Sequence, residues 1–263
     1  MSNARPHYTD FRRRLRNREH LLGTFIKTPT THATEILGLL GFDFVVIDQE
    51  HSPFGGNVID VMVLAARASN IAGIVRVGDP GEANILSMLD CGATGVLVPH
   101  VDSAQKARAV AAACRYRGGR RGFANTTRAG RFGEATFAEH MAAQDAEVAC
   151  IAMIEDVRAI EEIDAIAAVE GIDAFFIGRG DLTAAIGAPS MTSPETHRLV
   201  APIMEAARKA GMPVVVLSPD RHDAEAMAAL GASAFMYSSD HGMLKQAAKQ
   251  ALIDFAPPIR GRS

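Results

Sequence analysis

The sequence predicts an α/β fold, a single (β/α)8 TIM barrel, from three observations. The chain has 263 residues, close to the roughly 250 that are typical of one such barrel. Hydrophobic residues make up 48% of it, which is enough for one large core. Apolar β-like runs alternate with helical patterns, and polar residues directly follow these runs. A barrel of this kind builds its active site from the loops at the carboxyl ends of its strands.

Eight apolar runs give the predicted strands. They cover Leu22–Ile26, Phe44–Ile47, Gly73–Arg76, Gly95–Val98, Ala149–Ile154, Ala174–Ile177, Val214–Leu217 and Ala234–Tyr237. Between them we predict a helix over Asn57–Ser69, whose apolar residues share one face. Further helices are predicted to begin after Ser103, a plausible N-cap, and near Pro194, a residue suited to the first helical position.

Two basic segments interrupt this pattern. Residues 1–20 are predicted to form a helical extension of a single domain that spans residues 1–263. Within the extension, Phe11–Arg18 is interpreted as a short helix, capped by Thr9, that closes the bottom of the barrel; the alternative is an arm for nucleic acid or membrane. The long loop Arg115–Gly133 follows the fourth barrel helix, and it is either a lid or subunit contact or a mobile surface loop.

Composition restricts the partners of the protein. The formal net charge is −3 and the pI is about 6.3. This charge balance does not indicate a basic surface for nucleic acid or an anionic membrane. No apolar run approaches the ~20 residues of a membrane span, and no signal peptide is visible. Cys91, Cys114 and Cys150 are interpreted as reduced thiols without metal-ligand spacing. We therefore expect a cytoplasmic protein that acts on small molecules.

Two carboxylates follow neighbouring predicted strands. Glu155 comes directly after Ala149–Ile154, and Asp181 follows Ala174–Ile177. These strands are adjacent in a barrel, so both side chains converge at its mouth. Mg²⁺ typically binds through one or two protein carboxylates and leaves its other positions to water and substrate. The pair therefore predicts a divalent-metal site, although Asp181 alone could instead cap a short helix.

Arg76 ends a predicted strand that is otherwise uncharged. A buried arginine needs an anionic partner, and its planar fork suits a carboxylate or a developing enolate oxygen. The alternative is a structural ion pair with Glu50 or Asp48. We favour the active-site role, because the site needs a fixed cation opposite the metal.

A histidine follows the second predicted strand. Asp48 lies within reach of His51, and such a pair makes a plausible general acid–base unit because the carboxylate fixes the histidine tautomer. The alternative is an ordinary loop histidine, and His100 after the fourth strand is a weaker candidate. Gly178 and Gly180 allow a ligand close to the backbone. The sequence has no Rossmann or Walker signature.

These segments resemble one known family. Phe42–His51 is similar to the D-x-E-H segment of the HpcH/HpaI aldolases, which are metal-dependent lyases of 2-oxo acids. Other motifs of that family are resembled by Arg76-Val77, Leu89–Pro99, Arg115–Gly122, Ile154-Glu155 and Phe176–Leu182. The likeness extends from about Gly23 to the last predicted strand.

The resemblance implies a class II aldolase that reversibly cleaves a 4-hydroxy-2-oxo acid through a metal-bound enolate. The products would be pyruvate, or a related 2-oxo acid, and an aldehyde. Glu155 and Asp181 would bind Mg²⁺ or Mn²⁺, with Co²⁺ as a substitute in vitro. Arg76 would stabilise the enolate oxygen, and His51, oriented by Asp48, would transfer a proton. The remaining alternatives are a citrate-lyase-β or malyl-CoA-like lyase, a metal-free isomerase, and a non-catalytic effector-binding barrel.

Substrate contacts and assembly follow from the same resemblance. The substrate would contact Phe25, Arg76, Gly178, Arg179 and Gly180. Members assemble as trimers of dimers, a homohexamer in which Asp90 would reach a neighbour's site. Arg179 replaces a usual proline and Met153 a usual glutamine, so the resemblance leaves the donor and acceptor open.

Overall fold

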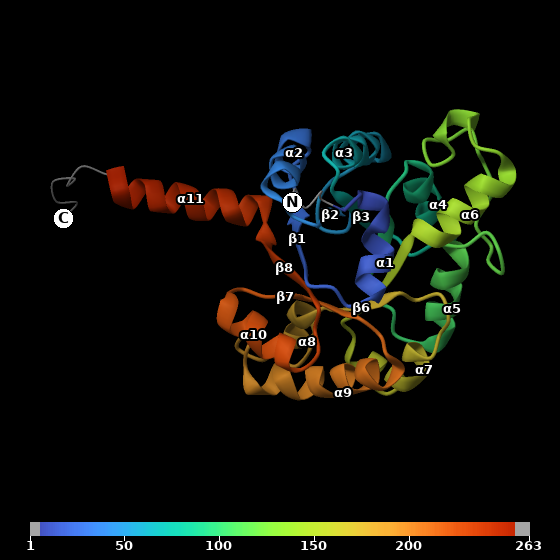
Figure 1. Ribbon diagram of the computed structural model, residues 1–263. Helices are drawn as coiled ribbons and strands as arrows, with labels where there is room; N and C mark the ends of the chain where they lie inside the picture. Colours follow the sequence, from blue (N-terminus) through green and yellow to red (C-terminus); the bar gives the residue numbers. More distant parts are fainter. Residues whose placement is uncertain (1–5, 256–263) are drawn as a thin grey trace, which may run out of the picture.

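A computed structural model describes residues 6–255 and shows eight parallel strands that close into a barrel in chain order. Helices surround the strands, as Figure 1 shows. The strands are β1 (Leu21–Ile26), β2 (Phe44–Asp48), β3 (Ala72–Arg76), β4 (Gly95–Val98), β5 (Ala149–Ile154), β6 (Ala174–Ile177), β7 (Val214–Leu217) and β8 (Ala234–Ser239). The predicted (β/α)8 fold is confirmed, and the largest difference in strand bounds is at β8, which continues to Ser239.

The helices alternate with the strands. The α-helices are α1 (Phe11–Arg16), α2 (Thr31–Leu40), α3 (Gly56–Ala68), α4 (Glu82–Asp90), α5 (Ala104–Ala113), α6 (Phe137–Glu147), α7 (Ile163–Ala167), α8 (Arg179–Ala185), α9 (Pro194–Ala210), α10 (Arg221–Ala229) and α11 (Asp240–Phe255). Short 3-10 helices are η1 (Tyr8–Asp10), η2 (Arg131–Gly133) and η3 (Val157–Ile160). The predicted N-cap is confirmed, because the Ser103 hydroxyl accepts a hydrogen bond from the Lys106 amide. Pro194 begins α9, as predicted.

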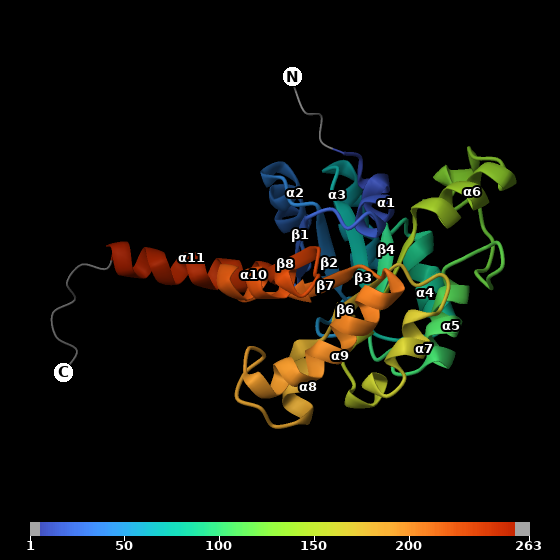
Figure 2. The same ribbon diagram turned by 60° about the horizontal axis from the view of Figure 1, so that its bottom comes forward.

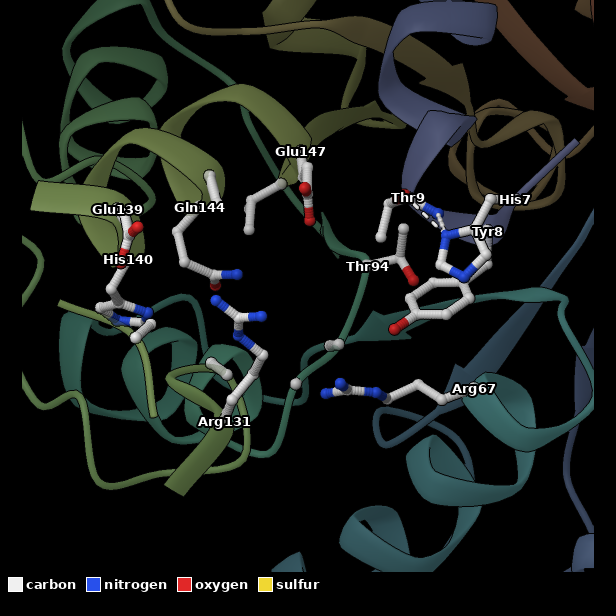
Figure 3. Close-up of a pocket in the computed structure, with 16 residues that line it drawn as sticks. His7, Tyr8, Thr9, Arg67, Thr94, Arg131, Glu139, His140, Gln144 and Glu147 are labelled. Atoms are coloured by element: carbon white, nitrogen blue, oxygen red, sulfur yellow. Dashed lines mark hydrogen bonds between the residues drawn. The ribbon is translucent and has the colours of Figure 1, made fainter. Parts of the chain in front are cut away.

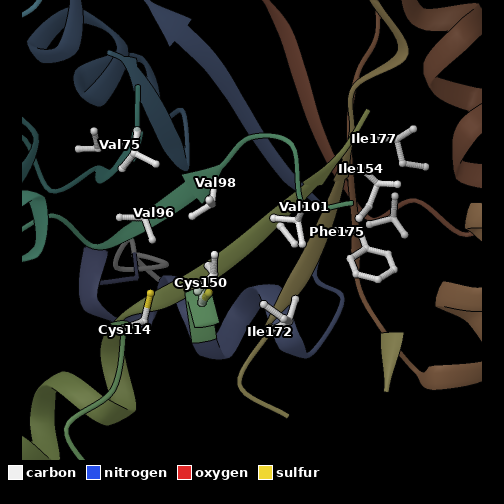
Figure 4. Close-up of a cluster of buried hydrophobic side chains, with 14 of the residues drawn as sticks. Val75, Val96, Val98, Val101, Cys114, Cys150, Ile154, Ile172, Phe175 and Ile177 are labelled. Carbon is white, nitrogen blue, oxygen red and sulfur yellow. The ribbon is translucent and has the colours of Figure 1, made fainter. Parts of the chain in front are cut away.

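The core has two layers on either side of the strands. Alternate residues of β2 show why: Phe44 and Val46 belong to the cluster inside the barrel, whereas Val45 and Ile47 belong to the cluster between strands and helices. Figure 4 shows part of the outer cluster, in which Cys114 and Cys150 are buried among aliphatic side chains. All three cysteines are free.

The N-terminal helix closes the amino end of the barrel, as predicted. Phe11 and Leu15 are buried in the inner cluster, and the Phe11 ring lies 5.2 Å from that of Phe44. Arg12 pairs with Asp173 at 2.9 Å, so this arginine docks the helix on the barrel. The predicted cap is wrong, because the helix begins after Asp10 and Thr9 lies in the preceding η1 turn. Residues 1–5 and 256–263 of the predicted domain lie outside the described residues.

The long basic loop after α5 is anchored to the body. Ion pairs with nitrogen–oxygen distances of 2.7–3.3 Å join Arg115 to Asp173, Arg121 to Asp90 and Arg128 to Asp60. They hold the loop against α3, α4 and the start of β6. Its role as a lid or subunit contact stays a prediction.

The last described helix, α11, projects away from the barrel in both views (Figures 1 and 2). Its apolar side chains Leu244, Leu252, Ile253 and Phe255 are 69–84% exposed. Among residues 6–255, none of the helices is long and apolar enough to cross a membrane.

Candidate active site

A cavity of about 330 Å³ opens among the carboxyl ends of the strands. The predicted site residues that line it are Phe25, His51, Arg76, Glu155, Gly178, Arg179, Gly180 and Asp181. They come from β1 and β3 and from the segments after β2, β5 and β6, so closure of the barrel brings them together. Phe25 and Phe176 form part of an apolar wall, with ring centroids 6.1 Å apart.

Arg76 is buried beside the cavity, with 6% of its surface exposed. Its guanidinium donates to both carboxylate oxygens of Asp48, at 2.9 Å from Nε and 2.7 Å from Nη2. Nη1 lies 3.1 Å from Oε2 of Glu50. The guanidinium also lies 4.8 Å from the centre of the Phe25 ring. Arg76 therefore has the ion pairs that the alternative interpretation expects, and it also lines the cavity.

Asp48 is bound differently from the prediction. Its fully buried carboxylate pairs with Arg76 and with the ammonium of Lys27, 2.5 Å from Oδ2. His51 contacts it through the backbone N–H at 3.2 Å, so the predicted orientation of the His51 imidazole by Asp48 is wrong. Burial raises the pKa of Asp48, but hydrogen bonds from Arg76 and Lys27 outweigh it and lower this pKa to about 2. The ionised carboxylate therefore positions two cations.

Glu155 is a buried carboxylate, 3% exposed, at the end of β5. Its Oε1 accepts a hydrogen bond of 2.8 Å from the backbone N–H of His100. Burial is the largest effect and raises the pKa of Glu155 to about 7; His100 opposes this rise, while the charges of Asp181 and Glu50 add to it. A divalent cation would offset the repulsion among these carboxylates, so the residues fit a metal ion.

Gly178 follows β6 and packs directly on Glu155. A Cβ atom at residue 178 would lie 2.4 Å from the Glu155 Cβ, so any side chain there would displace the carboxylate. At Gly180, in contrast, an added Cβ would meet nothing within 4 Å. Asp181 is exposed in the first turn of α8. Of the two glycines, packing therefore restricts only residue 178.

His100 and Glu50 also belong to the site, although the sequence prediction gave them less weight. Nε2 of His100 lies 3.8 Å from Oε1 of Glu50, and Nδ1 lies 3.4 Å from Oε1 of Glu155. One possible ligand atom from each of these three residues lies within 4.8 Å of the others. The signal in the sequence was the position of His100 two residues after the end of β4, which is similar to the positions of the stronger candidates after their strands.

With this geometry in place, comparison with known proteins identifies the family. Residues 21–247 match the HpcH/HpaI aldolase/citrate lyase family. The chain belongs to this family. A 5-keto-4-deoxy-D-glucarate aldolase of Klebsiella pneumoniae is 33% identical over 220 residues, which cover 83% of this chain and 85% of that protein. A hydroxypyruvate/pyruvate aldolase of Sagittula stellata is 33% identical over 241 residues, 90% of this chain and 94% of that protein.

A solved structure agrees with the sequence relatives. The crystal structure of an HpcH/HpaI aldolase/citrate lyase family protein from Burkholderia cenocepacia superposes with a TM-score of 0.88 at 28% identity. The match covers 95% of this chain and 100% of the Burkholderia chain. The fold and the aldolase relationship therefore extend over nearly the whole chain.

In this HpcH/HpaI family protein the Arg179 side chain is held by an ion pair within the fold. Although the residue lines the cavity, its guanidinium donates to both Asp223 oxygens and to the Leu217 carbonyl oxygen. Arg179 is 2% exposed, and the carboxylate of Asp223 in α10 neutralises its charge. The buried guanidinium thus has an anionic partner within the fold, and the predicted contact of Arg179 with substrate stays a prediction.

Asp90 lies at the opposite end of the HpcH/HpaI barrel. It ends α4, which leads to the amino end of β4, and its Oδ1 accepts a hydrogen bond of 3.3 Å from Arg121. Burial raises the pKa of Asp90. Its contribution to a neighbour's site stays a prediction.

A second, larger cavity of about 410 Å³ also lies at this amino end (Figure 3). Its lining includes Thr94 and Val148, which directly precede β4 and β5. In Figure 3 the side chains of Arg67 and Arg131 extend into it, as does that of Glu147. Since the strand ends that carry the predicted site lie at the other end, this cavity is separate from it.

Proposed function

We propose that the protein is a class II aldolase that reversibly cleaves a 4-hydroxy-2-oxo acid to pyruvate, or a related 2-oxo acid, and an aldehyde. One observation carries the proposal: a buried guanidinium and a group of carboxylates suited to a divalent cation face the same cavity. Relatives named 5-keto-4-deoxy-D-glucarate aldolase and hydroxypyruvate/pyruvate aldolase support this reaction class and a role in sugar-acid catabolism.

Glu155 and Asp181 would hold Mg²⁺ or Mn²⁺, with Co²⁺ as a substitute. The bound cation would supply Lewis acidity to the oxygens of a 2-oxo acid. The support is electrostatic, since Asp181 and Glu50 both raise the pKa of the buried Glu155. Gly180 leaves the backbone open for a substrate, and Gly178 and Phe25 line the same cavity.

Arg76 would stabilise the negative charge that develops when the bond between C3 and C4 breaks. The electron pair of that bond becomes the enolate of the 2-oxo acid, and a guanidinium held in advance needs no reorganisation to meet it. Asp48 fixes the guanidinium through two hydrogen bonds along its Nε–Nη2 edge. Two of the five N–H donors of Arg76 are used in hydrogen bonds to Asp48, which leaves three on the side that faces Glu50 and a substrate oxygen.

His51 would carry the proton of the 4-hydroxyl group. Cleavage leaves an aldehyde only if this proton departs, and the enolate carbon must then be protonated to give pyruvate. The His51 side chain is 59% exposed at the cavity and lies 3.9 Å from Glu50. Water can therefore link it to the hydroxyl group. Asp48 acts on Arg76 and Lys27 rather than on this imidazole.

The assembly would be a homo-oligomer, a trimer of dimers, in which α11 packs on a second copy of the chain. The helix extends away from its own barrel with its apolar side chains exposed (Figure 2). A matching surface exists on α2, where Ile36, Leu39 and Leu40 are 55–87% exposed. Burying both surfaces against each other would remove a large apolar area from water. Sedimentation should show a smaller species for Leu252→Lys/Phe255→Lys but not for Lys249→Ala, and an unchanged assembly would exclude this contact.

A screen of donors against acceptors tests the reaction class. Pyruvate and other 2-oxo acids are combined with aldehydes, with and without Mn²⁺, and the products are compared with those from citrate and malyl-CoA. We expect aldol products only from the 2-oxo acids and only with metal. Turnover confined to the CoA thioester or citrate would favour the citrate-lyase-like alternative, and metal-independent isomerisation or no turnover at all would reject the aldolase.

A further inference from the structure

We propose that His100 and Glu50 are additional ligands of the cation at Glu155, and that the imidazole nitrogen makes the site prefer Mn²⁺, Co²⁺ or Zn²⁺ to Mg²⁺. This inference rests on the proposed metal dependence. It goes beyond that proposal because it adds a nitrogen ligand from the β4 loop.

The spacing of the three side chains fits a shared ion. Two atoms bound at about 2.1 Å to one ion can lie no more than about 4.2 Å apart. Nε2 of His100 is 3.8 Å from Oε1 of Glu50, which is too long for a hydrogen bond but within this limit. The possible ligand atoms of His100, Glu50 and Glu155 all lie within 4.8 Å of one another, so any separation above about 4.2 Å must shorten by no more than about 0.6 Å for the three to share an ion.

The orientation of the ring favours Nε2 as the ligand atom. Nδ1 lies 3.2 Å from Oδ2 of Asp156, which can accept a hydrogen bond from Nδ1–H. A carboxylate on one ring nitrogen fixes the tautomer and leaves the lone pair of the other for a metal, as in many metal-bound histidines. The backbone of His100 is also held, because it has φ of 54° and its N–H donates to Glu155.

Glu50 connects the cation to the guanidinium. Its Oε2 lies 3.1 Å from Nη1 of Arg76, whereas its Oε1 faces His100. A carboxylate used in this way would couple the position of the ion to that of Arg76. The Glu50 carboxylate would then lie between two positive charges, which would compensate for its partial burial.

The ligand set determines the metal preference. Mg²⁺ favours oxygen ligands and near-ideal octahedral geometry, whereas imidazole suits Zn²⁺ and other transition metals. A site with two glutamates, an aspartate and a histidine should therefore discriminate against Mg²⁺ more than an all-oxygen site would. Removal of the histidine should reduce that discrimination.

Pulsed electron paramagnetic resonance of the Mn²⁺-loaded protein tests the proposal without an activity assay. We expect the nitrogen coupling of a bound imidazole in the wild type and in His51→Ala, and its loss in His100→Ala. Calorimetry should show that His100→Ala lowers Mn²⁺ affinity by at least about tenfold. Even changes to residues that only hold the metal ligands in place typically cost this much affinity. Mg²⁺ affinity should fall less.

The outcomes separate this inference from the proposed function. Mn²⁺ that binds without nitrogen coupling in the wild type, or with coupling that survives in His100→Ala but not in His51→Ala, would overturn the role of His100 while leaving metal dependence intact. If the wild type and Glu155→Ala both fail to bind Mn²⁺, the proposed metal site fails as well. The wild-type spectrum decides the question even if the alanine variant does not fold, and His100→Gln provides a second variant.

Discussion

Residue 178 shows how one missing methyl group shapes the candidate metal site. Gly178→Ala would place a Cβ atom 2.4 Å from the Glu155 Cβ and 2.9 Å from Oε2, so we expect the carboxylate to move. Mn²⁺ affinity measured by calorimetry should fall on the order of tenfold or more. Gly180→Ala is the matched control, because its Cβ would meet nothing within 4 Å and affinity should be retained. Wild-type affinity in Gly178→Ala would mean that Glu155 is not a ligand.

Arg76 is the residue on which transition-state stabilisation depends. Arg76→Ala should lower kcat by about 10²–10³, the loss found when one oxyanion donor is removed. Arg76→Lys should recover little, because a point charge replaces neither the two bonds to Asp48 nor the planar fork. Steady-state kinetics of aldol cleavage give the measurement. A near-normal kcat in Arg76→Ala would rule out this role.

At the scale of residues, the sequence identifies the site groups better than their partners. Arg76, Glu155 and Asp181 could be predicted to share a cavity because each follows a strand. The pair of Asp48 with Arg76 was considered only as an alternative, because it depends on the register that places Asp48 beside Arg76, whereas proximity along the chain favoured His51. The approach of His100 to Glu155 likewise depends on the left-handed backbone conformation of His100, which its sequence neighbours did not predict.

At the scale of elements, the strands were predictable for a physical reason. Residues of β2 and β5 are all buried, so each strand reads as a continuous apolar run between polar loops. Helix starts were predictable where a cap such as Ser103 marks them. The start of α1 was not, because the side chain of its N-cap Asp10 makes no capping hydrogen bond and a 3-10 turn precedes it.

The ion pair between Arg179 and Asp223 joins α8 to α10, and it predicts a pH effect on stability. Burial raises the pKa of Asp223, but hydrogen bonds from Arg179 outweigh it, so the folded-state pKa lies below the usual 3.8. The folded state therefore favours the ionised form. This stabilisation is present above about pH 4 and is lost as the pH falls through the folded-state pKa.

Urea unfolding at pH 7 and pH 3 measures this contribution. The loss of unfolding free energy on acidification should be smaller in Asp223→Asn than in the wild type. At pH 7, Arg179→Met should destabilise by about 3–5 kcal/mol, because Asp223 is then buried without a partner. Arg179→Met/Asp223→Leu should regain much of this loss. Equal stability of Arg179→Met and the wild type would show that the pair contributes little.

At the scale of the whole molecule, closure of the barrel is what creates the candidate site. The groups that face the cavity come from strands that are distant in sequence, and β8 pairs with β1 to complete the ring. The family relationship covers residues 21–247, which include every strand. The α11 helix extends beyond this closed unit, and nothing in its sequence alone distinguishes a helix that packs on its own barrel from one that packs on another copy.

Deuterium exchange at the methyl group of pyruvate tests the central claim most directly, because it requires enolate formation and no aldehyde. In the presence of Mn²⁺, the wild type should incorporate deuterium from D₂O into pyruvate, as measured by nuclear magnetic resonance. The EDTA-treated protein and Glu155→Ala should not. Arg76→Ala should exchange at least about 10²-fold more slowly. Exchange by the EDTA-treated protein at the wild-type rate would contradict a metal-dependent enolate, and with it the proposed function.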